Sequence, residues 1–390
     1  MKLINSPPLG RQGGAGIYIH IPFCKQACHY CDFHFSTSMK KKDEMIGAIQ
    51  KEIKLRQSEI DDKPIETIYF GGGTPTVVST ADLQSIIDVI YEHFLVSSSP
   101  EITVEANPDD LTEEKIITLA QSSINRLSIG IQSFFEEDLT IMNRAHNAKE
   151  AMDCLSIATQ YFDNISIDLI YGIPKMSIAR WKKNIELALG FGVPHISCYA
   201  LTVEPNTALP KLIENGIIPP VDEDLAQQHF EVLVETLENE GFTHYELSNF
   251  GKPGYFSKNN TAYWQGKSYL GIGPSAHSYN GKQRSWNVSN NTKYIKALEL
   301  KQFSREVEDL STTDRYNEYI MTGLRTVWGV SLKKVAKEFG KTYEKYLLEQ
   351  AQKHIEEHLL FLDGDILLVT KKGKFLSDGI ASDLFLLNLG

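Results

Sequence analysis

The sequence predicts an α/β protein: an incomplete parallel (β/α)6 barrel followed by a small, winged-helix-like C-terminal α+β domain. In the first two-thirds of the chain, six short apolar segments alternate with amphipathic ones, which is the pattern of parallel strands joined by helices. Polar residues follow the carboxyl ends of these apolar segments, where (β/α) barrels carry their sites. Near the C-terminus, helical segments precede a hairpin signal.

The elements of the barrel can be assigned in chain order from the spacing of apolar residues. Strands are predicted over residues 16–23, 65–70, 101–106, 126–132, 165–171 and 195–203. Helices are predicted over residues 43–59, 80–94, from about 112, and over 148–161, 178–190 and 222–241. We expect Thr80 to cap the second helix and Thr112 to open the third, because threonine side chains accept hydrogen bonds from first-turn N–H groups.

The rest of the chain divides into an irregular stretch and a small domain. From residue 250 to about 301 the periodicity fades, and helices are then predicted over 311–324, 331–339 and 343–358. Apolar residues 360–362 and 366–370 flank Asp363-Gly364-Asp365, which indicates a hairpin. We therefore expect a barrel core over 1–245, an irregular extension over 246–305 and a C-terminal domain over 306–390.

Composition excludes several classes of protein. The 390 residues are 42% hydrophobic and carry a formal net charge of −11, which argues against a general nucleic-acid binder. The basic run Lys333, Lys334, Lys337 and Lys341 is interpreted as a solvated helix face. No apolar run is long enough to span a bilayer, and residues 1–16 lack the apolar core of a signal peptide. These features favour a cytoplasmic protein, whose thiols stay reduced.

Three cysteines lie close together: Cys24, Cys28 and Cys31, with the spacing C-x3-C-x2-C. Three thiolates on one loop can ligate three irons of a [4Fe–4S] cluster and leave the fourth iron without a protein ligand. An open coordination site on a metal is where a small molecule binds. A fourth cysteine would favour a closed electron-transfer cluster, but Phe33 follows Asp32 here.

Two alternatives for these cysteines are a zinc site and ordinary free thiols. Zinc takes four ligands, and His20, His29 or His34 could supply the fourth. A disulfide framework suits a short secreted chain rather than one of this length. Cys154 and Cys198 are distant in sequence, and we expect both to pack in the interior.

The run Tyr18-x-His20-x-Pro22-Phe23, followed by the three cysteines, resembles the cluster motif of the radical S-adenosylmethionine (SAM) family. More narrowly, it resembles the branch that contains oxygen-independent coproporphyrinogen III oxidases and HemW-type heme chaperones. The resemblance extends over residues 16–279 and, more faintly, to the C-terminus. It implies a radical SAM barrel whose [4Fe–4S] cluster binds SAM at the open iron and cleaves it to a 5′-deoxyadenosyl radical after receiving one electron.

The resemblance also implies a set of SAM contacts at the strand ends. The segment 71–74, Gly-Gly-Gly-Thr, resembles the glycine motif that meets the SAM amino group, and Arg144 is suited to the SAM carboxylate. Each residue taken alone could instead be a rim or capping residue. The implied contacts are Tyr18, Tyr30, Gly72, Gly73, Thr74, Glu105, Gln132, Arg144, Asp168 and Ala200.

Two features favour the chaperone over the oxidase. The oxidase motif continues to a fourth cysteine, where this chain has Phe33, and few residues precede the cluster motif here. The resemblance therefore implies a chaperone that binds heme and passes it to an acceptor protein, which could include a transient membrane-protein acceptor. It implies an electron donor protein and no nucleic acid. Whether the chain is an enzyme stays open; oxidase activity, the alternative function, is not expected.

The heme-associated signature of the family is H-N-x-x-Y-W, and residues 259–264 match it except at the histidine, which is Asn259. An amide is a poor ligand for heme iron. His277, His244 and Tyr263 are the alternative ligands. His277 could equally be a packed histidine in a glycine-rich loop. Tyr263 and Trp264 could stack on a porphyrin or anchor the loop.

Overall fold

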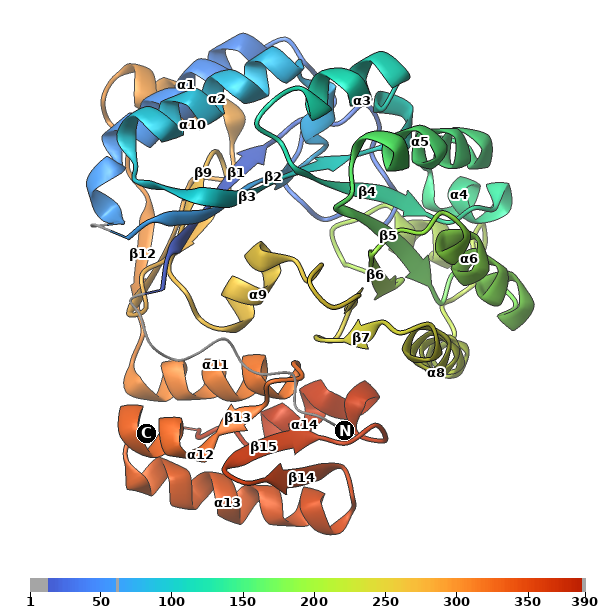
Figure 1. Ribbon diagram of the computed structural model, residues 1–390, viewed down its shortest axis with the longest axis vertical. Helices are drawn as coiled ribbons and strands as arrows, with labels where there is room; N and C mark the ends of the chain where they lie inside the picture. Colours follow the sequence, from blue (N-terminus) through green and yellow to red (C-terminus); the bar gives the residue numbers. More distant parts are fainter. Residues whose placement is uncertain (1–12, 61–62, 388–390) are drawn as a thin grey trace.

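The computed structural model describes residues 13–60 and 63–387. Figure 1 shows a curved sheet with helices on its outer side and, below it, a smaller unit formed by the C-terminal residues. The segment 1–12, which belongs to the stretch without a predicted signal core, lies outside the described residues.

Six adjacent parallel strands form the centre of the large sheet, and helices cover its outer face (Figure 1). The strands are β1 (Ala15–Ile21), β2 (Ile65–Gly72), β3 (Val96–Ala106), β4 (Arg126–Gln132), β5 (Ile165–Tyr171) and β6 (His195–Ala200). The covering helices are α1 (Lys42–Leu55), α2 (Thr80–His93), α3 (Glu113–Ala120), α5 (Ala148–Tyr161), α6 (Ile178–Gly190) and α8 (Glu223–Asn239). The predicted incomplete barrel is confirmed.

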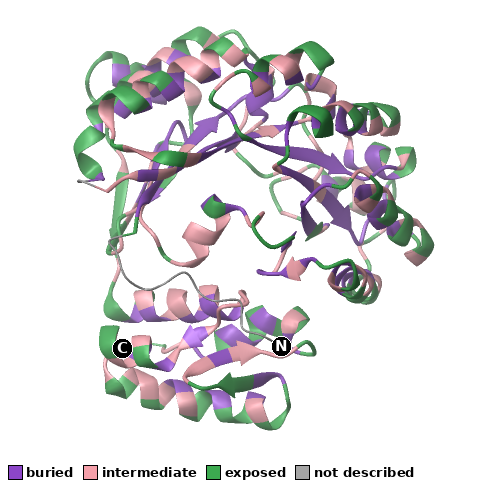
Figure 2. Ribbon diagram, viewed as in Figure 1, coloured by how far each residue is buried: buried purple, intermediate pink, exposed green. Residues whose placement is uncertain are grey.

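Both faces of these strands are covered, so polar as well as apolar side chains are buried. All seven positions of β4 are buried, and Figure 2 shows the sheet as the most continuously buried part of the molecule. The outward side chains pack on the helices, while the inward ones carry polar groups. Cys154 and Cys198 are buried as expected.

The start of α2 corrects one prediction. Ser79, not Thr80, is the N-cap: the Ser79 hydroxyl accepts from the Asp82 N–H at 3.0 Å, and the Asp82 carboxylate accepts from the Ser79 N–H. Thr80 is already the first helical residue, so its side chain cannot take that role. Thr112 caps α3 as predicted.

Two short helices of the barrel were not predicted, because six or seven residues are too few to show helical periodicity. They are α4 (Glu136–Met142) and α7 (Leu209–Glu214). Single 3-10 turns also occur at η1 (Gln57–Glu59), η2 (Pro75–Val77), η3 (Pro108–Asp110) and η4 (Lys374–Leu376).

The stretch predicted to be irregular contains regular elements. They are β8 (Asn249–Gly251), α9 (Lys258–Trp264), β9 (Tyr269–Ile272), β10 (His277–Tyr279), β11 (Gln283–Trp286) and α10 (Asn291–Glu299), and the stretch is flanked by β7 (Thr243–His244) and β12 (Glu306–Asp309). Strand β9 pairs in parallel with β1, and β10 to β12 continue the sheet in antiparallel fashion. These strands have four residues or fewer, which is too short for an alternation of apolar and polar residues to show in the sequence.

Distant side chains hold these strands in place. Arg56, just after α1, donates to the Gly271 carbonyl at 2.7 Å and to the Ser278 hydroxyl at 2.9 Å. Glu52, on α1, accepts from the Gly273 N–H at 2.8 Å and pairs with Arg56 at 2.8 Å. The fold of this stretch therefore depends on a buried charge pair more than 200 residues away in the chain.

The C-terminal unit has its own apolar core and a small antiparallel sheet in the order β13-β15-β14. Its elements are α11 (Thr312–Leu324), β13 (Val330–Ser331), α12 (Leu332–Glu338), α13 (Lys341–Glu356), β14 (Leu360–Asp363), β15 (Ile366–Val369) and α14 (Ser377–Asp383). The predicted hairpin is present, with Asp363 opposite Ile366 and Gly364 at a φ of +62°. The domain boundaries themselves stay predictions.

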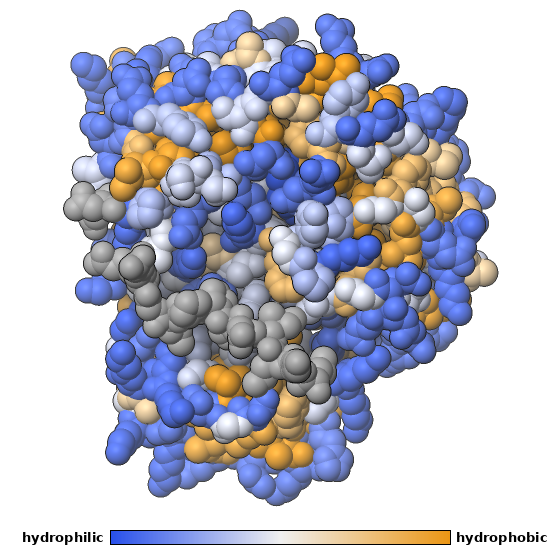
Figure 3. Space-filling model, viewed as in Figure 1, coloured by the Kyte–Doolittle hydropathy of each residue, from blue (hydrophilic) through white to orange (hydrophobic). Residues whose placement is uncertain are grey.

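The outer surface is mainly polar. The face seen in Figure 3 is mostly hydrophilic, with hydrophobic residues gathered between the upper helices and at the lower end of the C-terminal unit. Within residues 13–60 and 63–387, no helix combines the length and the apolar character needed to cross a membrane.

Candidate functional site

The three clustered cysteines lie on a loop that follows β1 at the carboxyl edge of the barrel strands. Pairing between Phe23 and Ser36 closes the base of this loop, where the Cys24 N–H donates to the Ser36 carbonyl at 3.1 Å. All three cysteines are free thiols. The loop therefore presents them from a backbone that is fixed at both ends.

The far side of the loop is anchored to α4, one of the helices that periodicity did not reveal. The Gln26 amide donates to the Asn143 carbonyl at 2.9 Å, and the Asn143 amide donates to the Ala27 carbonyl at 2.8 Å. Asn143 ends α4 with a φ of +55°, a conformation that asparagine tolerates better than most residues. Lys25 pairs with Asp109 at 3.0 Å and also with Asp110.

A chain of hydrogen bonds joins the cysteine loop to β3 and β4. The Thr74 hydroxyl donates to Cys24 Sγ at 3.6 Å, and the Asn107 amide donates to Thr74 Oγ1 at 3.2 Å. Arg144 Nη2 donates to Asn107 Oδ1 at 2.6 Å, and Arg144 Nη1 donates to Cys28 Sγ at 3.3 Å. Hydrogen bonds thus connect Thr74 and Arg144 to two cysteine sulfurs, and Asn107 links Thr74 to Arg144.

Asn107 and Asn143 are the residues that sequence reasoning left out of the site. Asn107 directly follows the predicted strand that ends in Glu105-Ala106, so its place at the rim was a usable signal. Asn143 gave no signal, because its role comes from contacts with a loop more than 100 residues earlier.

The glycine segment after β2 packs directly on the cysteine loop. The Gly73 N–H donates to the Ile21 carbonyl at 2.9 Å, and the Thr74 N–H donates to the Phe23 carbonyl at 2.7 Å. Gly72 has a φ of +107°, and a Cβ atom there would lie 2.5 Å from the His20 ring. Glycine is therefore required at 72 by both backbone conformation and space.

Two carboxyl groups point into the barrel below the rim. The Tyr69 hydroxyl donates to Glu105 Oε1 at 2.7 Å, and burial raises the pKa of Glu105 to about 7. Burial also raises the pKa of Asp168 to about 6, partly offset by a hydrogen bond from Ser197. In the ligand-free protein these groups titrate close to neutrality, so a ligand that donates hydrogen bonds would favour their charged forms.

The remaining predicted SAM contacts occupy the same edge of the barrel. The Tyr30 hydroxyl accepts from Arg144 Nη1 at 3.3 Å, and the Tyr18 hydroxyl bonds His20 Nδ1 at 3.2 Å. Gln132 ends β4 with a φ of +63°. Ala200 pairs with Tyr171 at the ends of β6 and β5.

The donor set suits an iron–sulfur cluster. Burial raises the pKa of Cys24 and of Cys31 to about 11, so in the metal-free protein both are thiols and iron would displace their protons. Arg144 Nε is buried without a hydrogen-bond partner among the described residues, which leaves one donor for a bound group. In the described part of the chain, no three His, Cys, Asp or Glu side chains converge on a single metal position. Cluster thiolates bind separate irons and need not converge.

A cleft of about 1390 Å³ opens next to this site. It is bounded by β1, by α9, by β9 and β10, and by α11 and α12 of the C-terminal unit. Typical small-molecule sites measure ~300–1,000 Å³, so the cleft has room for a large ligand. Its aromatic lining comprises Tyr18, Phe33, Tyr199, Tyr263, Trp264, Tyr269, Tyr279, Tyr319, Phe339 and Phe385.

The three alternative heme ligands differ in burial and in whether they line the cleft. His244 is buried, stacked on Phe250 with ring centroids 4.2 Å apart, and both of its ring nitrogens have partners. Tyr263 lines the cleft, as does His277, which is exposed. Trp264 lies in the cleft under the Arg325 guanidinium, 5.7 Å from the ring centre.

Similar proteins are known over most of the chain. Residues 18–194 match the Radical SAM superfamily and residues 310–376 match the HemN C-terminal domain. The heme chaperone HemW of Bacillus subtilis is 34% identical over 367 residues, covering 93% of this chain and 97% of that protein. The HemW of Mycobacterium tuberculosis H37Rv is 31% identical over 375 residues, covering 95% of this chain and 94% of that protein.

One solved structure resembles almost the whole chain. It is coproporphyrinogen III oxidase (HemN) from Escherichia coli, with a TM-score of 0.83 and 21% sequence identity, covering 96% of this chain and 91% of that one. At this identity the likeness shows the fold alone.

Proposed function

Because the chain belongs to the family of the heme chaperone HemW, in the radical SAM superfamily, we propose that it binds heme and transfers it to an acceptor protein. The observation that carries the proposal is similarity along almost the full length, at 34% identity, to proteins with that name. Phe33, in place of a fourth cysteine, supports the chaperone over the oxidase.

Cys24, Cys28 and Cys31 would hold a [4Fe–4S] cluster, and SAM would bind beside it. When bound, the cluster and SAM supply one-electron chemistry that no amino-acid side chain provides. The protein contributes placement: Thr74 and Arg144 donate to two of the sulfurs and stabilise negative charge on them. Each hydrogen bond to sulfur also fixes the rotamer of its cysteine.

The rim side chains would then position SAM. Arg144 suits the SAM carboxylate because its guanidinium is already held in place by Asn107 and the Gly130 carbonyl. Glu105 and Asp168 would accept hydrogen bonds from hydroxyl groups of the ribose. Tyr18, Tyr30, Gln132, Gly72, Gly73 and Ala200 would complete the pocket wall.

The partners follow from this chemistry. The cluster requires an electron donor protein, and heme released into water aggregates, so transfer requires a direct contact with the acceptor protein. The cleft between barrel and C-terminal unit is the place where heme would lie within reach of both.

A heme transfer assay tests the proposal. The anaerobic protein is titrated with hemin, and the loaded protein is mixed with an apo-protein acceptor whose absorption spectrum is distinct. We expect a Soret shift on loading and movement of heme to the acceptor. Failure to bind heme, combined with conversion of coproporphyrinogen III to protoporphyrinogen IX in the presence of SAM and a reductant, would replace the chaperone with the oxidase.

A further inference from the structure

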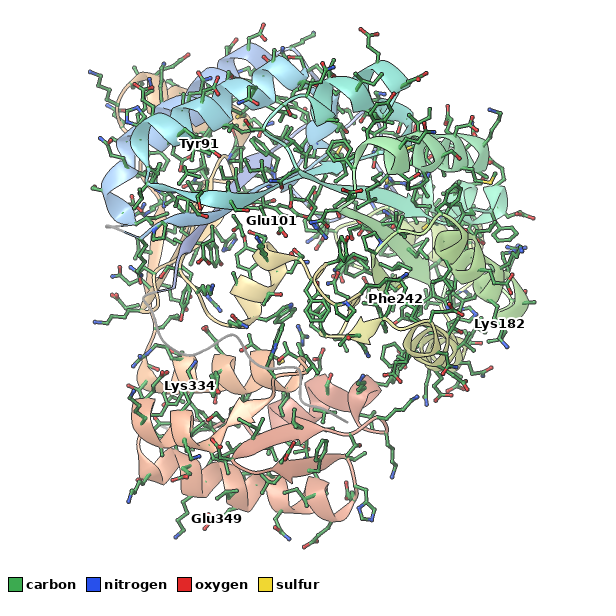
Figure 4. All side chains as sticks on the ribbon, in the orientation of Figure 1. Tyr91, Glu101, Lys182, Phe242, Lys334 and Glu349 are labelled. Atoms are coloured by element: carbon green, nitrogen blue, oxygen red, sulfur yellow. The ribbon has the colours of Figure 1, made fainter. Side chains whose placement is uncertain are left out.

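The residue at the family's signature histidine position is enclosed in this structure. Asn259 is 4% exposed, and its Oδ1 accepts from the Thr67 hydroxyl at 3.1 Å. Its backbone N–H donates to the Glu101 carboxylate at 3.1 Å; Figure 4 labels Glu101 on β3, above the start of α9. Asn259 is absent from the cleft lining, although Asn260, one position later, belongs to it.

Of the histidines in the described residues, three line the cleft: His20, His34 and His277. His20 bonds the Tyr18 hydroxyl at 3.2 Å and the His34 carbonyl at 2.8 Å. His34 bonds Asn291 Oδ1 at 2.7 Å. Within the described residues, His277 makes no side-chain hydrogen bond, so both of its ring nitrogens are available to a ligand.

The strand register places His277 on a face of polar and aromatic side chains. His277 lies opposite Trp286, and Tyr279 lies opposite Arg284. Because alternate residues of a strand share a face, these four side chains lie on the same side of the β10–β11 pair. The His277 and Trp286 rings are stacked, with centroids 5.7 Å apart and planes 24° apart.

Cations on the opposite wall suit the carboxylates of a porphyrin. Arg315 and Lys334 line the same cleft, and neither forms a salt bridge in the described part of the chain. Lys334, labelled in Figure 4, lies 4.4 Å from the ring centre of Tyr319. Arg284 is already paired with Glu318 at 2.8 Å, so it is less available.

We propose that His277 ligates the heme iron in this chain, with the porphyrin against the β10–β11 face and its carboxylates toward Arg315 and Lys334. The proposal rests on the proposed function and names the ligand of that same site. Histidine is among the usual axial ligands of heme iron. Partial burial and, less strongly, the Arg284 charge lower the pKa of His277, which keeps the ring in the neutral form that binds metals.

Hemin titration of the full chain tests the proposal. Difference spectra are recorded against the same protein without hemin, so that cluster absorption cancels. We expect His277→Ala to lose the Soret shift of the wild type and to bind hemin about tenfold more weakly or worse. Added imidazole should restore the wild-type spectrum, because it can replace the missing ring. His93→Ala, which removes a histidine of α2 that is absent from the cleft lining, is the control and should behave like the wild type.

A second variant examines the signature position directly. Adding Asn259→His to His277→Ala should leave the Soret shift absent, because a side chain at 259 is enclosed by β2 and β3. An unchanged shift and affinity in His277→Ala would overturn the assignment while leaving heme binding intact. Restoration of the shift by Asn259→His would overturn the placement of the porphyrin against the β10–β11 face. No Soret shift in the wild type would overturn the proposed function and this ligand with it.

Discussion

The barrel rim and the cleft wall differ in how their functional groups are held. At the rim, Thr74, Asn107 and Arg144 form a continuous set of hydrogen bonds that ends on two cysteine sulfurs. On the wall, His277, Arg315 and Lys334 face the cleft. Among the described residues, Arg315 and Lys334 form no ion pair and His277 forms no side-chain hydrogen bond. Pre-paired groups retain a resident cofactor, whereas unpaired groups can engage and release a cargo. We infer that the protein separates cofactor retention from cargo exchange in this way.

The largest effect should come from the rim. Cys24→Ala, Cys28→Ala and Cys31→Ala should each reduce the iron content of anaerobically purified protein to near zero, because two thiolates hold a cluster poorly. Iron and acid-labile sulfide are measured per chain. Cys154→Ala, which removes a buried cysteine from α5, is the control and should keep the full iron content. Full iron in all three loop variants would refute the ligand assignment.

The strands of the cleft wall, β9 to β11, should be destabilised when the buried charge pair between Arg56 and Glu52 is broken. Arg56→Met should lower the free energy of unfolding by about 3–5 kcal/mol, because Glu52 would remain buried without its counter-charge. Arg305→Met, which breaks a partly exposed pair with Glu59, should cost about 0–1 kcal/mol. Denaturant unfolding measures both. Equal losses would mean that β9 to β11 do not depend on the buried pair.

A smaller effect, on SAM affinity, is expected from Asn107, which links Thr74 to Arg144 at the rim. Asn107→Ala should weaken SAM binding by about 1–2 kcal/mol, roughly tenfold, because Arg144 loses the acceptor that orients it. Iron content should stay unchanged, since all three cysteines remain. Isothermal titration with SAM measures the affinity, and Asn147→Ala, at the cap of α5, is the control. A drop in iron content without a change in affinity would assign Asn107 to the cluster instead.

The most subtle effect concerns pH. The pKa of Glu105 is raised to about 7 from an ordinary 4.5, so the folded state holds this proton more tightly than the unfolded state. The stability that the proton contributes is complete below about pH 4.5 and is lost as the pH rises through 7. Glu105→Gln stays neutral and should therefore be more stable than the wild type at pH 8 by on the order of 2 kcal/mol, with no gain near pH 4.5.

The control for this pH series is Glu240→Gln, an exposed position after α8. It should follow the wild type at every pH. A gain for Glu105→Gln that is the same at pH 5 and pH 8 would point to packing rather than to the proton.

The sequence predicted the rim better than the wall, for physical reasons. Strands β1 to β6 have six or more residues each, enough for a strand pattern to show in the sequence. Parallel strands bring their carboxyl ends to one edge, so Glu105, Gln132 and Asp168 could be placed together. Strands β9 to β11 have three or four residues and depend on Arg56 and Glu52, which no local pattern reveals. The burial of Asn259 was equally hidden, because it follows from contacts with Thr67 and Glu101 on other strands.

The central claim is a cluster held by three cysteines, with its fourth iron open to SAM. Electron–nuclear double resonance on the reduced cluster, with SAM labelled by ¹⁵N at its amino group, tests it most directly. We predict a ¹⁵N hyperfine coupling in the wild type that disappears when unlabelled SAM displaces the labelled form. A reduced cluster that binds SAM with no ¹⁵N coupling, or a chain that holds only zinc, would contradict the account.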